Sequence, residues 1–216
     1  MMRWAVFAAV GLGVGLLGCR DPVDKLQSAN PDECIEGLRE MAHRGHEGDV
    51  ECVAQVTSRA DNKVAAEAVR ALGGMGRPQA VQALAKVAAD DRRSGIREEA
   101  VLQLGRRRDD KALDVLRTAV VHDPDPQVRA AAATSIARLR SYADVPLLMD
   151  VAERDEDPQV QSRAVGAVEG MIGLKFGYNA KGSPEERAAV LARARSVGTR
   201  AAAALMQQAR RSQVKP

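Results

Sequence analysis

The chain has 216 residues, of which 28% are charged and only 2% are aromatic, and its formal net charge is +3. A charge so close to balance does not require a polyanionic partner. Good helix formers such as alanine are abundant, whereas the aromatic residues that favour strands are scarce, so the composition predicts an all-α fold and excludes one built on sheets.

The N-terminus has the features of an export signal. Arg3 is followed by an apolar run over residues 4–17 and then by Gly18 and Cys19. A basic residue, an apolar run of about 7–15 residues and a small residue before the cleavage site are typical of a secretory signal peptide, whereas a span across a bilayer takes about 17–25 residues. We therefore expect residues 1–18 to be a signal peptide rather than a permanent membrane anchor.

The tetrapeptide Leu16-Leu17-Gly18-Cys19 resembles the lipobox of bacterial lipoproteins. The resemblance implies that Cys19 carries acyl chains such as palmitate, becomes the first mature residue and anchors the chain to a membrane of the cell envelope. Arg20 stands where enteric lipoproteins retained at the inner membrane have aspartate, which favours the outer membrane, facing the periplasm. The alternative is an ordinary export signal followed by a chance cysteine. Residues 19–29 are expected to form a tether.

A period of 32 residues organises the next part of the chain. Three columns of residues recur at this spacing: Val64, Ile96, Val128 and Val160; Ala68, Ala100, Ala132 and Ala164; Leu72, Leu104, Ile136 and Val168. A fixed period of this length is typical of solenoids, in which each unit is too small to bury its own apolar face and needs its neighbours. We expect about four and a half such units over residues 30–182.

Each unit has the pattern of two helices. In the second unit, apolar residues follow helical spacing from Val64 to Leu72, glycines then interrupt the pattern, and Pro78 suits the first turn of the next helix. The alanine column is expected where two helices approach closely. The first unit is irregular, and Asn30 with Pro31 is expected to begin its first helix.

Two cysteines lie on the two helices expected in the first unit. In an oxidising compartment Cys34 and Cys52 are candidates for a disulfide, but buried cysteines also serve as small apolar residues, and the sequence leaves both interpretations open. His43 and His46 have no CxxC motif beside them, so no metal site is expected.

The repeated motif resembles a known family. Asp125-Pro126-Gln127-Val128-Arg129 is followed by Ala132 and Ile136, and Asp157-Pro158-Gln159-Val160 repeats its opening. These units resemble HEAT repeats of the short bacterial type, similar to the phycobilisome-lyase-like HEAT family. The resemblance implies a right-handed α-solenoid in which aspartates and arginines of successive repeats form a ladder. The residues to which it assigns this structural role are Arg97, Arg129, Asp125 and Asp157.

The C-terminal segment is expected to close the solenoid. Ser183 and Glu186 have the spacing of a capping box, which predicts a long capping helix over residues 183–211, followed by a tail at 212–216. Four apolar residues of this helix are expected to face inward: Leu191, Ala194, Ala201 and Leu205.

No group of residues has the arrangement of a catalytic or cofactor-binding site, so we expect no enzyme activity, no cofactor and no small-molecule substrate. Paired carboxylates such as Asp90-Asp91 fall between helices, where they are expected to cap helix N-termini. The expected function is that of a scaffold or adaptor that binds a protein partner on a concave face formed by the second helix of each unit. The residues expected to contact the partner are Gln82, Lys86, Asp114, Thr118 and Asp150.

Two alternatives concern this function. Fold analogy alone permits a lyase-like or chromophore-handling protein, which the scarcity of aromatic residues and the export signal disfavour. Arg106-Arg107-Arg108, Arg138 and Arg140 recur at the same turn of successive units and are expected to form a basic edge, which permits electrostatic binding of nucleic acid or acidic lipid. Export removes the usual nucleic acid, so no nucleic-acid partner is expected.

Overall fold

The computed structural model describes residues 21–46, 48–107 and 109–213, and within these ranges all regular structure is helical. The prediction of an all-α repeat fold is confirmed. The elements are α1 (Pro22–Leu26), α2 (Pro31–Arg44), α3 (Asp49–Val56), α4 (Asn62–Gly74), α5 (Pro78–Asp90), α6 (Ser94–Leu104), α7 (Asp110–His122), α8 (Pro126–Arg138), the 3-10 turn η1 (Tyr142–Asp144), α9 (Val145–Arg154), α10 (Pro158–Ile172) and α11 (Pro184–Gln213).

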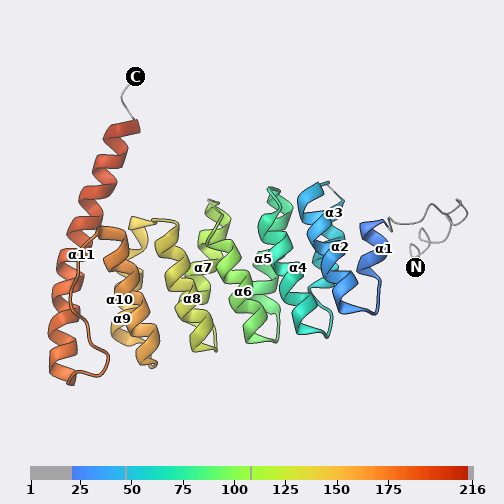
Figure 1. Cartoon of the computed structure of the whole chain (residues 1–216). Coiled ribbons are helices and arrows are strands. Elements are labelled where there is room, and N and C mark those ends of the chain that lie inside the picture. The colour runs from blue at the N-terminus through green and yellow to red at the C-terminus, as the bar shows by residue number, and fades with distance from the viewer. Residues whose placement is uncertain (1–20, 47, 108, 214–216) are drawn as a thin grey trace, which may run out of the picture.

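The helices form antiparallel hairpins that stand side by side in one row, from α1 at the N-terminal end to α11 at the other (Figure 1). The first helices of the hairpins, α2, α4, α6 and α8, pack against one another and against α10 in one layer. The second helices, α3, α5, α7 and α9, form the other layer, and each also packs against the first helix of the following unit. The stack thus shares one continuous core, as repeats of this size require.

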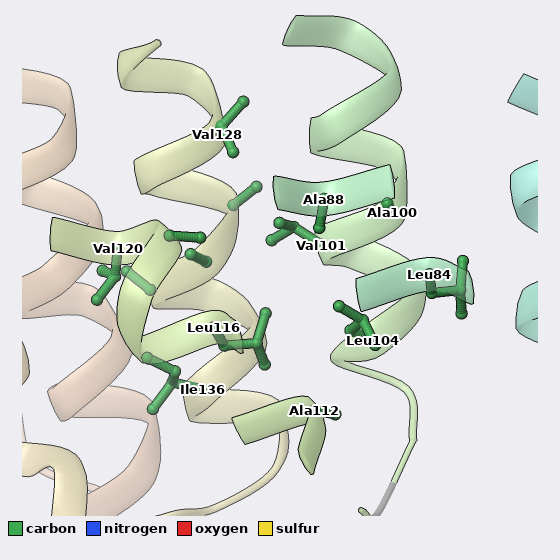
Figure 2. Packing of buried hydrophobic residues seen from close by; sticks show 14 of the residues in the cluster. Leu84, Ala88, Ala100, Val101, Leu104, Ala112, Leu116, Val120, Val128 and Ile136 are labelled. Carbon is green, nitrogen blue, oxygen red and sulfur yellow. The ribbon is translucent and has the colours of Figure 1, made fainter. Parts of the chain in front are cut away.

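The three columns of the 32-residue period form this core. All twelve of these residues are buried, and the alanines of the middle column have no exposed surface. The larger residues of the other two columns are buried in the same core. Figure 2 shows side chains from α5, α6, α7 and α8, including Leu84, Ala100 and Leu116, packed together across three successive hairpins.

The helix ends follow local sequence signals. Aspartate side chains accept hydrogen bonds from backbone amides at the starts of α4, α7, α8 and α10, and proline occupies the first turn of α2, α5, α8 and α10. Gly45 and Gly173 end α2 and α10 in the left-handed conformation, with φ of 63° and 74°. Arg140 takes the same conformation after α8, with φ 54°, and is the non-glycine residue of the described chain that does so.

The expected tether differs from the structure. Within residues 19–29, the segment Pro22–Leu26 is helix α1, and Leu26 is buried against the first hairpin. Gly37 of α2 makes this packing possible, because a Cβ atom there would lie 2.7 Å from Lys25 Cβ and 2.9 Å from the Pro22 carbonyl oxygen. The solenoid therefore begins at α1, close to Cys19 in sequence. Cys19 and the predicted signal peptide lie outside the described residues.

Only part of the closing helix, α11, packs against the solenoid. Ser183 and Glu186 form the predicted capping box: the Ser183 amide donates to Glu186 Oε2 at 2.9 Å and the Glu186 amide donates to Ser183 Oγ at 3.2 Å. Leu191 and Ala194 are buried as predicted, whereas Ala202 rather than Ala201 is the buried alanine of the next turns. The last turns of α11 extend beyond the row of hairpins (Figure 1). None of the described helices combines the length and apolar character needed to cross a membrane.

Candidate interaction surfaces

Arg97, which is buried, and Arg129, which is largely buried, tie successive units together. The Arg97 guanidinium donates to both carboxylate oxygens of Asp123 at 2.9 Å, and that of Arg129 donates to both oxygens of Asp155 at 2.7 and 2.9 Å. The remaining nitrogen of each donates to a carbonyl in the preceding turn, that of Asp91 at 2.8 Å and that of Asp123 at 2.9 Å. Each arginine therefore joins the turn before its hairpin to the turn after it.

The aspartates of these pairs are not the ones that the sequence motif indicated. The carboxylates of Asp125 and Asp157 cap helices: they accept hydrogen bonds from the amides of Gln127 at 2.8 Å and Gln159 at 2.7 Å. A carboxylate oriented toward the first amides of its own helix does not reach the arginine, so the assignment of Asp125 and Asp157 to the ladder was wrong. Arg97 and Arg129 bind instead the aspartates two residues earlier in the chain, Asp123 and Asp155.

The aspartates that do pair also follow the 32-residue period, at positions 91, 123 and 155, and this signal was available in the sequence. Each accepts a hydrogen bond from the backbone amide two residues later. The bond from the Arg93 guanidinium lowers the pKa of Asp91. Burial by itself raises the pKa of Asp155, but the bonds from Arg129 and from the Asp157 amide outweigh it and hold that pKa below its usual value.

Part of the predicted basic edge also has a structural role. The Arg107 guanidinium donates to the carbonyl oxygens of Met75, of Gly73 at 3.1 Å and of Arg77 at 3.1 Å, and so caps the C-terminal end of α4. Arg77 in turn donates to the Gly45 carbonyl at 3.1 Å. These bonds link the hairpin turns of successive units. Arg108 lies outside the described residues.

The second-helix surface carries most of the residues expected to contact a partner. Gln82 and Lys86 of α5 and Asp114 and Thr118 of α7 are exposed. Between these two helices lies a cavity of about 360 Å³. Its walls are mostly apolar and its polar groups include the buried Arg97–Asp123 pair; the residues that line it include Ala88, Ala89, Val115, Thr118, Ala119 and His122.

Asp150 differs from these four residues because it forms an ion pair with the closing helix. Its carboxylate accepts a hydrogen bond from Arg195 of α11 at 2.7 Å, and the same guanidinium binds Glu153 at 2.7 and 2.8 Å. The closing helix packs on α9 and pairs with the carboxylate of Asp150, whose side chain is still 44% exposed, so a partner would meet Asp150 as part of this ion pair.

A second, larger groove of about 810 Å³ lies on the first-helix layer, between α8 and α10. Thr134 and Ala137 line one side, and small residues of α10, including Ser162, Gly166 and Gly170, line the other. A Cβ atom added at either glycine would have no neighbour within 4 Å, so this wall is open to the surface.

The two cysteines are free thiols. Cys34 is buried, with Sγ 3.3 Å from Arg59 Nη1 and 3.6 Å from the Leu26 carbonyl oxygen, so it fills space between α1 and α2. Cys52 is partly exposed and lines a shallow groove with Val23 of α1. Over the described parts of the chain, no group of three or more histidine, cysteine, aspartate or glutamate side chains has the geometry of a metal site.

Comparison with known proteins agrees with this architecture. The model of the family described as HEAT repeats matches residues 19–104, 50–137, 94–169 and 114–209. No curated protein matches the chain.

Among solved structures, the complex of CpcE and CpcF of phycocyanin lyase from Nostoc sp. PCC7120 is 18% identical, with a TM-score of 0.53, and the match covers 77% of this chain and 71% of that one. An engineered protein is also 18% identical, with a TM-score of 0.48 and coverage of 85% and 95%. A designed armadillo repeat protein is 17% identical, with a TM-score of 0.43 and coverage of 85% and 100%. At this identity the likeness to the Nostoc protein is one of fold and does not extend to lyase activity.

Proposed function

Because the chain belongs to the HEAT-repeat family, we propose that it is a non-enzymatic scaffold that binds a protein partner on its second-helix surface while tethered to a membrane of the bacterial envelope. Stacked repeats present a long surface on which every unit offers different side chains, and proteins of this architecture typically use such surfaces for binding. The partner is a protein that inserts apolar side chains between α5 and α7.

The cavity between α5 and α7 is the observation that carries this proposal. Ala88, Ala89 and Ala119 leave a space of about 360 Å³, within the usual range for binding pockets. A fully desolvated apolar side chain seated in such a space is the usual anchor of a protein interface. Lys86 and Asp114 are exposed near it and supply polar groups for the rim.

A matched pair of substitutions tests this surface. Thr118 lines the cavity between α5 and α7, and Thr134 lines the groove between α8 and α10; the hydroxyl of each donates to the carbonyl four residues earlier, at 3.1 and 3.0 Å. Thr118→Arg fills the cavity on the proposed surface, whereas Thr134→Arg introduces the same change on the opposite layer.

In pull-downs from envelope membranes, Thr118→Arg is expected to abolish capture of the partner that the unchanged chain retains, and Thr134→Arg is expected to preserve it. Circular dichroism of both variants checks that the fold is kept. Loss of capture with Thr134→Arg alone would instead place the partner on the first-helix layer and refute the assignment.

The membrane tether rests on the tetrapeptide that ends at Cys19. In cells supplied with labelled palmitate, the wild-type chain should incorporate label and fractionate with outer membranes, and Cys19→Ser should lose both properties. Incorporation of label without outer-membrane fractionation would limit the proposal to the lipid anchor. Absence of label from the wild-type chain would refute the anchor while leaving the scaffold proposal intact.

A further inference from the structure

The two edges of the solenoid differ in charge. One edge, here the hairpin-turn edge, is formed by the turns inside each hairpin and by the end of α10: residues 45–46 and 48, 75–77, 105–107 and 109, 139–144 and 173. The opposite edge is formed by the turns between hairpins, and it carries the carboxylates of Asp123, Asp125, Asp155, Glu156 and Asp157. Arg97 and Arg129 bind two of these carboxylates, and Glu156 is exposed.

The hairpin-turn edge carries exposed cations that form no ion pair with a described carboxylate: Arg106, Lys111, Arg138 and Arg140. The described carboxylates at the hairpin-turn edge already form ion pairs or accept hydrogen bonds. Asp49 binds Arg44, Asp144 binds Arg117, and Asp109 accepts the Lys111 amide at the start of α7. The free charge of this edge, among the residues that the structure describes, is therefore positive.

Arg140, at the same edge, has a left-handed backbone conformation that is unusual for an arginine. It occupies the left-handed position after α8, whereas glycine occupies the corresponding positions after α2 and α10. A side chain with a Cβ atom pays conformational free energy in this region, and glycine does not. The guanidinium is exposed and makes no hydrogen bond within the described chain, so packing does not explain the arginine. A residue held in a sparsely populated backbone region is a basis for a hypothesis of function.

The chain enters the solenoid at the same edge. Asp21 Oδ1, at the start of α1, lies 3.8 Å from Arg44 Nη1, and Arg44 is the last residue of α2, next to the turn at Gly45. Cys19 precedes Asp21 by two residues, a span of at most roughly 7 Å. If Cys19 is acylated, as the proposed function holds, the membrane lies next to this edge.

We propose that the hairpin-turn edge binds an anionic bilayer surface, so that the solenoid faces the membrane with this edge and with the projecting last turns of α11, where Arg210 and Arg211 are exposed (Figure 1). The cations bind lipid phosphates, and the opposite edge, where Asp125, Glu156 and Asp157 lie among exposed Arg92 and Arg154, points away from the negative surface. Both helix layers then face sideways, and the second-helix surface stays open to a protein partner. The lipid anchor brings the chain to the membrane, and the basic edge sets its orientation there.

The test uses the unlipidated chain of residues 19–216, which keeps every described helix, and vesicles of phosphatidylcholine with or without phosphatidylglycerol. Binding is expected only to vesicles that contain phosphatidylglycerol, and it should weaken as salt is added. Each Lys or Arg near an anionic surface contributes about a fivefold change in binding, so Arg138→Gln with Arg140→Gln should weaken binding roughly 30-fold.

The matched control is Arg92→Gln with Arg154→Gln. Both arginines are exposed on the opposite edge, and the pair changes the net charge by the same amount. This control should bind vesicles almost as the unchanged chain does. Equal weakening by the two pairs, or equal binding to both vesicle types, would overturn the proposal, as would binding to an acidic peptide but not to vesicles.

Arg140→Gly separates binding from folding. Glycine relieves the left-handed strain, so the thermal midpoint should rise while vesicle binding falls about fivefold. A rise in stability with unchanged binding would contradict the role given to Arg140. Because these assays use no lipidated protein, a negative result leaves the Cys19 anchor standing, and failure of palmitate labelling leaves the vesicle result standing.

Discussion

The arginine ladder allows one prediction to be worked out from the structure. At position 161, the position equivalent to Arg129, the chain has glutamine, whose amide donates to the Asp155 carbonyl at 2.7 Å. Arg129→Gln should likewise keep the bond to the Asp123 carbonyl, but it leaves the Asp155 carboxylate without its guanidinium. The Asp155 side chain is only 8% exposed, so its charge is poorly solvated.

Removing one partner of a buried ion pair costs about 3–5 kcal/mol. The Arg129 side chain is 15% exposed and Asp155 keeps the amide of Asp157 at 2.9 Å, so we expect a smaller loss of about 2–3 kcal/mol. For a chain of this length, that loss lowers the thermal midpoint by roughly 4–12 °C.

Urea unfolding followed by circular dichroism measures this loss. Arg154→Gln is the control, because Arg154 is exposed and forms no ion pair with a described carboxylate; its cost should stay within about 0.5 kcal/mol. A double-mutant cycle with Asp155→Asn should give a coupling energy of about 1–2 kcal/mol. Coupling near zero, or a cost of Arg129→Gln no larger than that of the control, would refute the argument that this pair ties the units together.

Three further outcomes are expected. The pKa of Asp155 is lowered in the folded state, so the contribution of its carboxylate to stability is present above the unfolded pKa of about 3.9 and is lost as pH falls through the folded value. Asp155→Asn removes this contribution. The variant should therefore unfold more easily at neutral pH, and its stability should change less with pH in acid. Gly105→Ala should cost about 1–3 kcal/mol in thermal unfolding, because the new Cβ would lie 2.9 Å from a Cα atom of α8, whereas Gly74→Ala, with no neighbour within 4 Å, should not destabilise the fold. In the native protein a thiol reagent should label Cys52 much faster than Cys34, and mass spectrometry of the unreduced chain should show both thiols free; a mass lower by two hydrogens would contradict this.

Several features of the fold could be predicted from residue spacing. The 32-residue period identified the buried columns, and the aspartates, prolines and glycines of the turns marked where helices begin and end. The capping box at Ser183 and Glu186 was also predictable. These signals are local, because a cap or a helical stripe depends on residues within one or two turns of one another.

The site residues were harder to predict, because their contacts join distant parts of the chain. The spacing of Arg129 and Asp157 is compatible with a ladder, but the direction in which each side chain points depends on how the helices pack, and the structure pairs Arg129 with Asp155. Asp150 has the register of an exposed residue on α9, and only the return of α11 brings Arg195 against it.

The charge of the hairpin-turn edge also required the tertiary structure. In sequence, Arg107 and Arg140 are both arginines of recurring turns. The packing of one hairpin on the next gives Arg107 three carbonyl oxygens to cap and leaves Arg140 exposed. Repetition along the chain was sufficient to indicate a stacked helical body, because helical periodicity is a local property. Which side chains stay free to bind a partner depends on which groups the neighbouring units and the closing helix bring within hydrogen-bonding distance, and only the assembled stack sets those distances.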